Sequence, residues 1–168
     1  MKALFSLLLA VPLAAQITIN LNPGGTNEKI TLISKTGSVE LTPGSHHHNK
    51  VVQLFTKTFT AFMKPAEKTV EAQPETISFG KIRPTKGRNT VLVRLSKDGE
   101  YFKAVLKEGM SGFSAYEESI PYPGKKAPEP VKQPDGIWTL TLPEPLTPGD
   151  YALVSDTENW QFHVAAAK

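Results

Sequence analysis

The sequence predicts an all-β fold, and two observations carry this prediction. Apolar and polar residues alternate with a period of two, as in ITINLN at 17–22, and such alternation is typical of strands with one buried face. Pro-Gly dipeptides, which favour tight turns, recur at 23–24, 43–44, 123–124 and 148–149. Short strands separated by turns at these intervals are typical of a β-sandwich or barrel.

The individual strands follow in chain order from the same alternation. KITLIS at 29–34 and SVEL at 38–41 flank a Lys-Thr-Gly turn and predict a hairpin. Asp98-Gly99 predicts a second hairpin turn. Further strands are expected at 75–80, 89–95, 101–106, 137–142, 150–155 and 159–164. In the last of these, alternation turns Trp160, Phe162 and Val164 inward and His163 outward, and Trp138 is likewise expected in the core.

One segment, VVQLFTKTFTAFM at 51–63, fits two periods. Its apolar residues include a helical spacing of three and four, whereas three threonines and the aromatic enrichment favour a strand. We predict one long strand with a bulge over this segment.

The chain length of 168 residues supports a single domain. The first fifteen residues, MKALFSLLLAVPLAA, combine one early lysine, a Leu-rich run and small residues at Ala14 and Ala15. This pattern is typical of a cleaved secretory signal peptide, and its apolar run is too short to span a bilayer as a helix. We therefore expect a signal peptide at 1–15 and an exported domain at 16–168, in the periplasm or outside the cell, without a transmembrane segment.

Composition excludes several classes of protein. The chain contains no cysteine, which removes disulfides, a lipid-anchored cysteine, thiol catalysis and cysteine-bound zinc. Its formal net charge is +3, and loss of Lys2 with the signal peptide leaves 18 basic against 16 acidic residues, or +2. This balance does not favour nucleic acid as a partner.

A basic stretch between Phe79 and Lys97 is the main local concentration of charge. It offers a possible contact for an anionic surface, although a solvated loop that protects a sheet edge is the favoured interpretation. The residues in question are Lys81, Arg83, Lys86 and Arg88.

The interval 120–136 contains five prolines and three lysines and is expected to be an extended loop within the domain. A docking segment is one interpretation, and a stiff surface crossover is the favoured one. Near this loop, Tyr116 and Tyr122 are predicted to be exposed aromatic contact residues.

Three consecutive histidines follow the second Pro-Gly turn. If the segment is a strand, His46 and His48 share one face and, together with His163, offer ligands for zinc, copper or nickel. No carboxylate lies within three residues of the cluster on either side. A solvated loop explains the histidines equally well and is the favoured interpretation.

No catalytic motif is recognisable. GMSGFS at 109–114 lacks the spacing of a nucleophile elbow, and Glu117 and Glu118 would face opposite ways on a strand. The nucleotide-binding and calcium-binding loop motifs are missing as well. We therefore predict a protein that is not an enzyme and uses no cofactor.

The C-terminal half resembles a set of uncharacterised bacterial exported β-sandwich proteins that carry a motif of the form PLxPGEYAL…FxV. PEPLTPGDYALV at 143–154 and the later WQFHV are the matching parts, and the resemblance extends over roughly 27–164. Asp150 replaces the usual glutamate, and His163 stands where such sequences often have glycine. The resemblance implies a single immunoglobulin-like β-sandwich and no activity.

Three hypotheses for function remain. The first is a non-catalytic exported binding or structural module of the bacterial envelope, whose partner is an envelope protein or polymer. The alternative is a periplasmic metal-binding protein that uses the histidine cluster, and the third is an enzyme with an unrecognised site. The sequence leaves the oligomeric state open.

Overall fold

The computed structural model describes residues 15–20, 29–53, 56–81, 90–109, 112–155 and 158–166. Within these ranges the chain is all-β, as predicted, and contains no α-helix. Residues 1–14, which make up nearly all of the expected signal peptide, lie outside the described part. The elements are β1 (Ala15–Asn20), β2 (Lys29–Ser34), β3 (Gly37–Leu41), β4 (Gly44–Gln53), β5 (Thr56–Met63), β6 (Thr76–Ser78), β7 (Val91–Arg94), β8 (Ser96–Asp98), β9 (Tyr101–Gly109), β10 (Gly112–Ala115), the 3-10 turn η1 (Glu117–Ser119), β11 (Val131–Lys132), β12 (Trp138–Thr141), β13 (Gly149–Val154) and β14 (Glu158–Val164).

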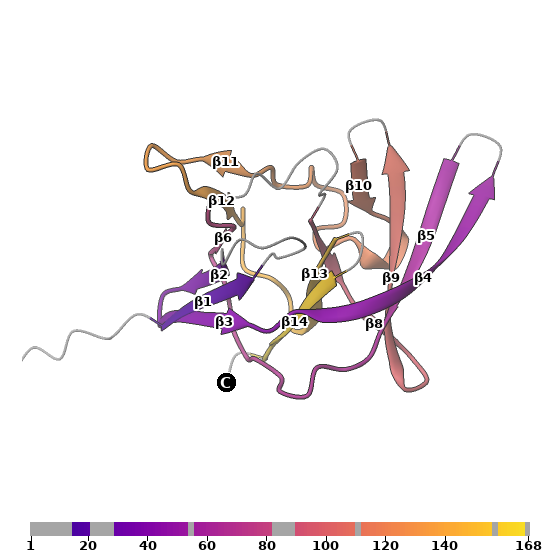
Figure 1. Cartoon of the computed structure of the whole chain (residues 1–168), viewed down its shortest axis with the longest axis horizontal. Coiled ribbons are helices and arrows are strands. Elements are labelled where there is room, and N and C mark those ends of the chain that lie inside the picture. The colour runs from indigo at the N-terminus through magenta and orange to yellow at the C-terminus, as the bar shows by residue number, and fades with distance from the viewer. Residues whose placement is uncertain are drawn as a thin grey trace, which may run out of the picture.

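The first sheet consists of β1, β3, β2, β6, β12 and β11, on the left in Figure 1. The predicted hairpin of β2 and β3 is present, and β1 pairs with both of its strands, antiparallel to β2 and parallel to β3. In this arrangement Ile17 is paired with Leu32 and Ile19 with Ile30. The alternation over 17–20 therefore does correspond to a strand, and residues 21–22 of the expected strand lie outside the described part.

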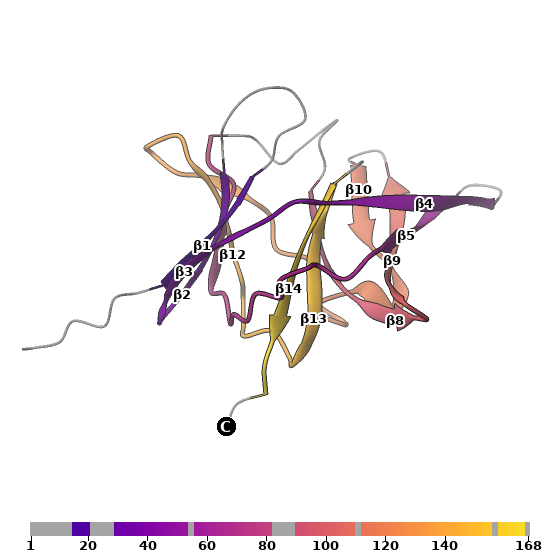
Figure 2. The same cartoon turned by 60° about the horizontal axis from the view of Figure 1, so that its bottom comes forward.

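The second sheet has the order β10-β9-β5-β4-β14-β13-β7, with β8 added beside β9. Its β8–β9 hairpin turns at Gly99, whose φ of 61° is the left-handed conformation that glycine adopts without strain. The sheet curls until β10 lies against β7, so that it nearly closes on itself. Figure 2 shows the first sheet on one side of β13 and β14 and the β4–β5 and β9 strands on the other.

The segment from 44 to 63 differs from our expectation. It forms a hairpin, in which β4 and β5 pair without a bulge from His46 opposite Met63 to Gln53 opposite Thr56. The prediction of a single bulged strand at 51–63 was wrong, and so was the solvated loop around the histidines. The preference for strand was right, because threonines and aromatics do favour it. The reversal was missed because no Gly, Pro or Asn-Gly marks it.

Two hydrophobic cores lie on opposite faces of the same central strands. The first core fills the space between the two sheets and contains Trp160 and Phe162, whereas the second fills the inside of the curled sheet. Along β13, Leu153 faces the first core and Ala152 faces the second. Strand β13 is therefore buried on both faces, which explains its nearly continuous apolar sequence.

The motif PLTPGDYALV forms the turn into β13. The Tyr151 side chain is fully buried, and its hydroxyl donates to the backbone oxygen of Thr147 at 2.9 Å. Its ring stacks on Phe162 of the neighbouring strand, with centroids 5.7 Å apart. The motif is thus a packing device that ties the turn to the first core.

The proline-rich interval is irregular, as expected, except for the two-residue strand β11. However, the prediction that Tyr122 is an exposed contact residue was wrong. Its side chain is only 4% exposed and belongs to the first core, and its hydroxyl donates to the backbone oxygen of Glu144 at 3.0 Å. Burial also raises the pKa of Tyr122 to about 12. The loop is therefore anchored to the core by this ring.

Candidate functional site

A groove of about 810 Å³ lies where the base of the β4–β5 hairpin meets β14 and the segment that follows β5. We call it the histidine groove, because two residues of the histidine cluster line it. Its walls are Val39, Glu40, Thr42, Pro43, Gly44, Ser45, His46, His47, Phe62, Lys64, Pro65, Ala66, Glu67, Lys68, Val70, Tyr101, Asn159 and Gln161.

Three aromatic rings cluster in one wall of the groove. The His47 ring stacks on Phe62, with centroids 5.5 Å apart and planes at 16°, and meets Tyr101 edge to face at 5.7 Å. The strand registers produce this cluster. His47 of β4 is paired with Phe62 of β5. Tyr101 of β9 is the neighbour of Phe102, which is paired with Met63 of β5. The His47 side chain is exposed and the other two are half-buried, so the groove has accessible ring surface.

Two amide side chains that line the groove hold the surrounding backbone in place. The Asn159 amide nitrogen donates to the backbone oxygens of Gly44 and Ser45, both at 3.0 Å. The Gln161 amide nitrogen donates to the Lys64 backbone oxygen at 2.7 Å, and its amide oxygen accepts from Ala66 N–H at 3.1 Å. The side chains also bond to each other at 2.8 Å. The network ties both sides of the groove to β14, so the groove is preformed.

The charges that line the groove are balanced. The groove is lined by two positive residues, Lys64 and Lys68, and by two negative residues, Glu40 and Glu67. The side chains of all four are exposed. Such a lining creates no strong field of one sign. Accessible rings combined with polar groups of balanced charge suit an uncharged polar ligand that also has apolar faces.

The structure does not bring the three proposed metal ligands together. The strand register places His46 and His48 on one face of β4, as the strand interpretation required. Glu158 of β14 is paired with Ser45, the neighbour of His46. His163 lies five residues further along β14, which places it roughly 16 Å from Glu158. Its Nδ1 atom is instead 2.9 Å from a carboxylate oxygen of Asp150. Among the described residues, no group of three histidines or acids is placed to hold a metal ion.

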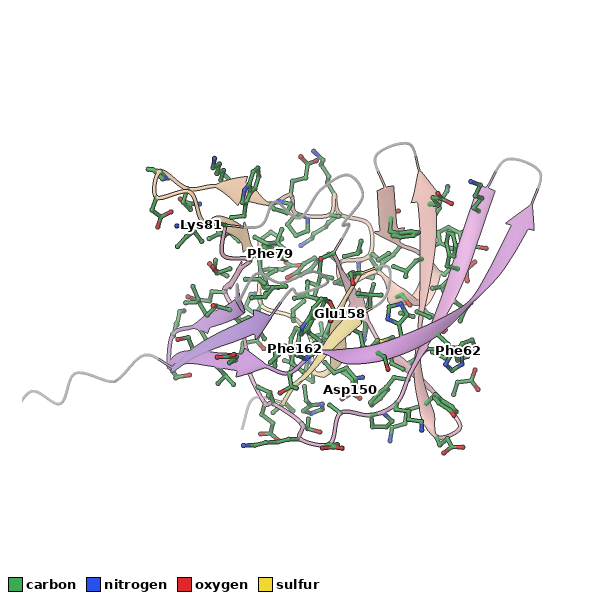
Figure 3. The ribbon with its side chains drawn as sticks, viewed as in Figure 1. Phe62, Phe79, Lys81, Asp150, Glu158 and Phe162 are labelled. Atoms are coloured by element: carbon green, nitrogen blue, oxygen red, sulfur yellow. The ribbon has the colours of Figure 1, made fainter. Side chains whose placement is uncertain are left out.

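The other predicted contact residues lie apart from the groove. Lys81 is exposed just beyond β6, near Phe79 and far from Phe62 in Figure 3, whereas Arg83, Lys86 and Arg88 lie outside the described residues. The Tyr116 ring is half-buried, with the Lys107 ammonium group 5.7 Å from its centroid.

The aromatic cluster was missed at the level of sequence. His47, Phe62 and Tyr101 come from three strands, and only the registers among these strands bring the rings together. The signal that could have found them is the outward position of Phe62 in an otherwise apolar-inward strand.

No match to this chain is found among known protein families, curated proteins or solved structures. A search of the described residues for a helix long and apolar enough to cross a membrane also finds none.

Proposed function

We propose that this protein is a non-catalytic binding module of the bacterial envelope, exported through its N-terminal segment, and that the histidine groove binds a polysaccharide chain. The observation that carries this proposal is the cluster of His47, Phe62 and Tyr101 in a preformed groove of balanced charge. Aromatic rings pack against the apolar faces of sugar rings while polar groups bond to the hydroxyls.

An immunoglobulin-like sandwich is the architecture that we propose for this module. The bond from the Tyr151 hydroxyl to the Thr147 backbone four residues upstream supports it, because a tyrosine that closes the corner into a late strand is a hallmark of such sandwiches. The two sheets packed around the first core support it as well.

Binding of the mature protein to a soluble N-acetylglucosamine hexasaccharide and to purified peptidoglycan sacculi tests the function. We expect binding that is lost in His47→Ala and Tyr101→Ala. Tyr116→Ala is the matched control, because that ring is also half-buried but lies outside the groove. The proposal fails if neither probe binds, or if the groove variants bind as well as the control does.

A further inference from the structure

The outer edge of β4 is a long, regular strand edge that no described strand covers. On one side, β4 pairs with β5 as far as Gln53, and on the other side only Gly44 and Ser45 pair, with β14. Alternate residues of an antiparallel strand direct their N–H and C=O groups to opposite sides. About half of residues 47–53 therefore present backbone groups to this open edge. Figures 1 and 2 show β4 as the outer border of a hairpin that projects from the body of the molecule.

This edge has few of the features that usually prevent strands from pairing with other chains. Residues 47–53 contain no proline and one charged residue, Lys50, and their register with β5 has no bulge. In contrast, the edge strand β11 has two residues and lies between Pro130 and Pro134, and β10 has only four residues. The β4 edge is thus the least protected of these three.

We propose that the β4 edge pairs with the β4 edge of a second copy of this chain, antiparallel and about a two-fold axis. An antiparallel edge offers itself the complementary donors and acceptors, so no second sequence is required. An acidic peptide is the less favoured partner, because one lysine on the edge provides little attraction at the protein surface.

The charge on the edge selects the register. A two-fold axis perpendicular to the sheet must place one residue of β4 directly opposite the same residue of the second copy. If that central residue were Lys50, the lysines of the two copies would face each other and repel. A centre at Asn49 instead places Lys50 opposite His48 and Val51 opposite His47, with overlap along most of the open edge. The two Asn49 Cα atoms would then lie about 4.5–5.5 Å apart, a separation that a disulfide can bridge.

A single-cysteine experiment tests both the pairing and its register, because the chain has no cysteine of its own. Under mild oxidation, Asn49→Cys is expected to form a disulfide-linked dimer. Glu129→Cys, on the exposed proline-rich loop, is expected to remain a monomer. Val51→Cys alone is expected to link poorly, whereas a mixture of Val51→Cys and His47→Cys is expected to form the mixed dimer.

Sedimentation velocity of the unmodified mature protein provides the second readout. We expect a dimer whose population increases with protein concentration. The dimer is expected to persist in Asn49→Ser and to be lost in Asn49→Lys, because the two added lysines would face each other across the two-fold axis. Circular dichroism checks that each variant is folded. The proposal is overturned by a monomer at all concentrations, by a dimer that Asn49→Lys leaves intact, or by linkage of Asn49→Cys no faster than that of Glu129→Cys.

Discussion

At the scale of single residues, the two tryptophans differ in their contribution to stability. Trp160 is fully buried in the first core, whereas Trp138 is half-buried and packs against the margin of that core. We expect Trp160→Ala to lower the free energy of unfolding by about 3–5 kcal/mol, and Trp138→Ala to lower it by clearly less. Urea denaturation of both variants measures the difference. Equal losses would show that Trp138 is as deeply packed as Trp160.

A second prediction at this scale concerns Glu158. Burial raises the pKa of its carboxyl group, and its Oε2 atom is buried with no hydrogen-bond partner among the described residues. An acid with a raised pKa in the folded state stabilises the fold when it is protonated. That stabilisation is fully present below the unfolded-state pKa and is lost as the pH rises through the raised folded-state pKa.

Glu158→Gln removes the charge but keeps the shape of the side chain. We therefore expect it to raise the melting temperature at pH 7 and to change it less at pH 4, where the native carboxyl group is largely protonated already. Glu67→Gln, at an exposed position, is the control and is expected to show no such pH-dependent gain. A lower melting temperature for Glu158→Gln at pH 7 would mean that the carboxylate has a favourable partner.

Residue-level burial in the proline-rich loop shows where sequence reasoning fails. Prolines correctly excluded a central strand in that interval, but nothing local indicated that Tyr122 turns inward. Its ring packs in the first core, and its hydroxyl donates to the backbone oxygen of Glu144, 22 residues away in sequence. Long-range partners of this kind leave no periodic signal in the sequence.

At the scale of the element, β5 is the strand on which the projecting hairpin depends. Its middle residue Thr60 pairs with Asn49 of β4 on one side and with Val105 of β9 on the other. Because β4 and β9 both form hydrogen-bonded ladders with β5, the backbone N–H of Thr60 is needed for a ladder bond whichever neighbour it faces. We expect Thr60→Pro to cost about 3 kcal/mol or more, and Thr60→Ala no more than about 1 kcal/mol. Thermal unfolding checks both, and a stable proline variant would mean that one of these ladders is absent.

The hairpin also marks the limit of what alternation can predict. A period of two located most of the described strands, because it depends only on which face is buried, but it missed the short strands β8, β10 and β11 and most of β4. Pairing depends on where the chain reverses, and between Gln53 and Thr56 no turn-forming residue announces the reversal. The aromatic cluster of the histidine groove was hidden for the same reason.

At the scale of the whole molecule, the two cores share strands that are buried on both faces. The sequence contained a sign of this, since VLV at 91–93 and YALV at 151–154 are apolar without interruption. In β7, Leu92 faces the first core and Val93 faces the second, and β13 repeats the pattern. One core therefore cannot lose these strands while the other keeps them.

This sharing predicts a single cooperative unfolding transition. Met63 is fully buried in the second core, whereas both tryptophans belong to or border the first. We expect Met63→Ala to lower the free energy of unfolding by about 2–5 kcal/mol. The unfolding midpoint measured by tryptophan fluorescence should shift by as much as the midpoint measured by far-ultraviolet circular dichroism, because different probes coincide in two-state unfolding. Ile77→Ala, which is fully buried in the first core, should behave in the same way. If Met63→Ala moves the dichroism midpoint but leaves the fluorescence midpoint unchanged, the curled part of the second sheet unfolds by itself, and the shared strands do not couple the two cores.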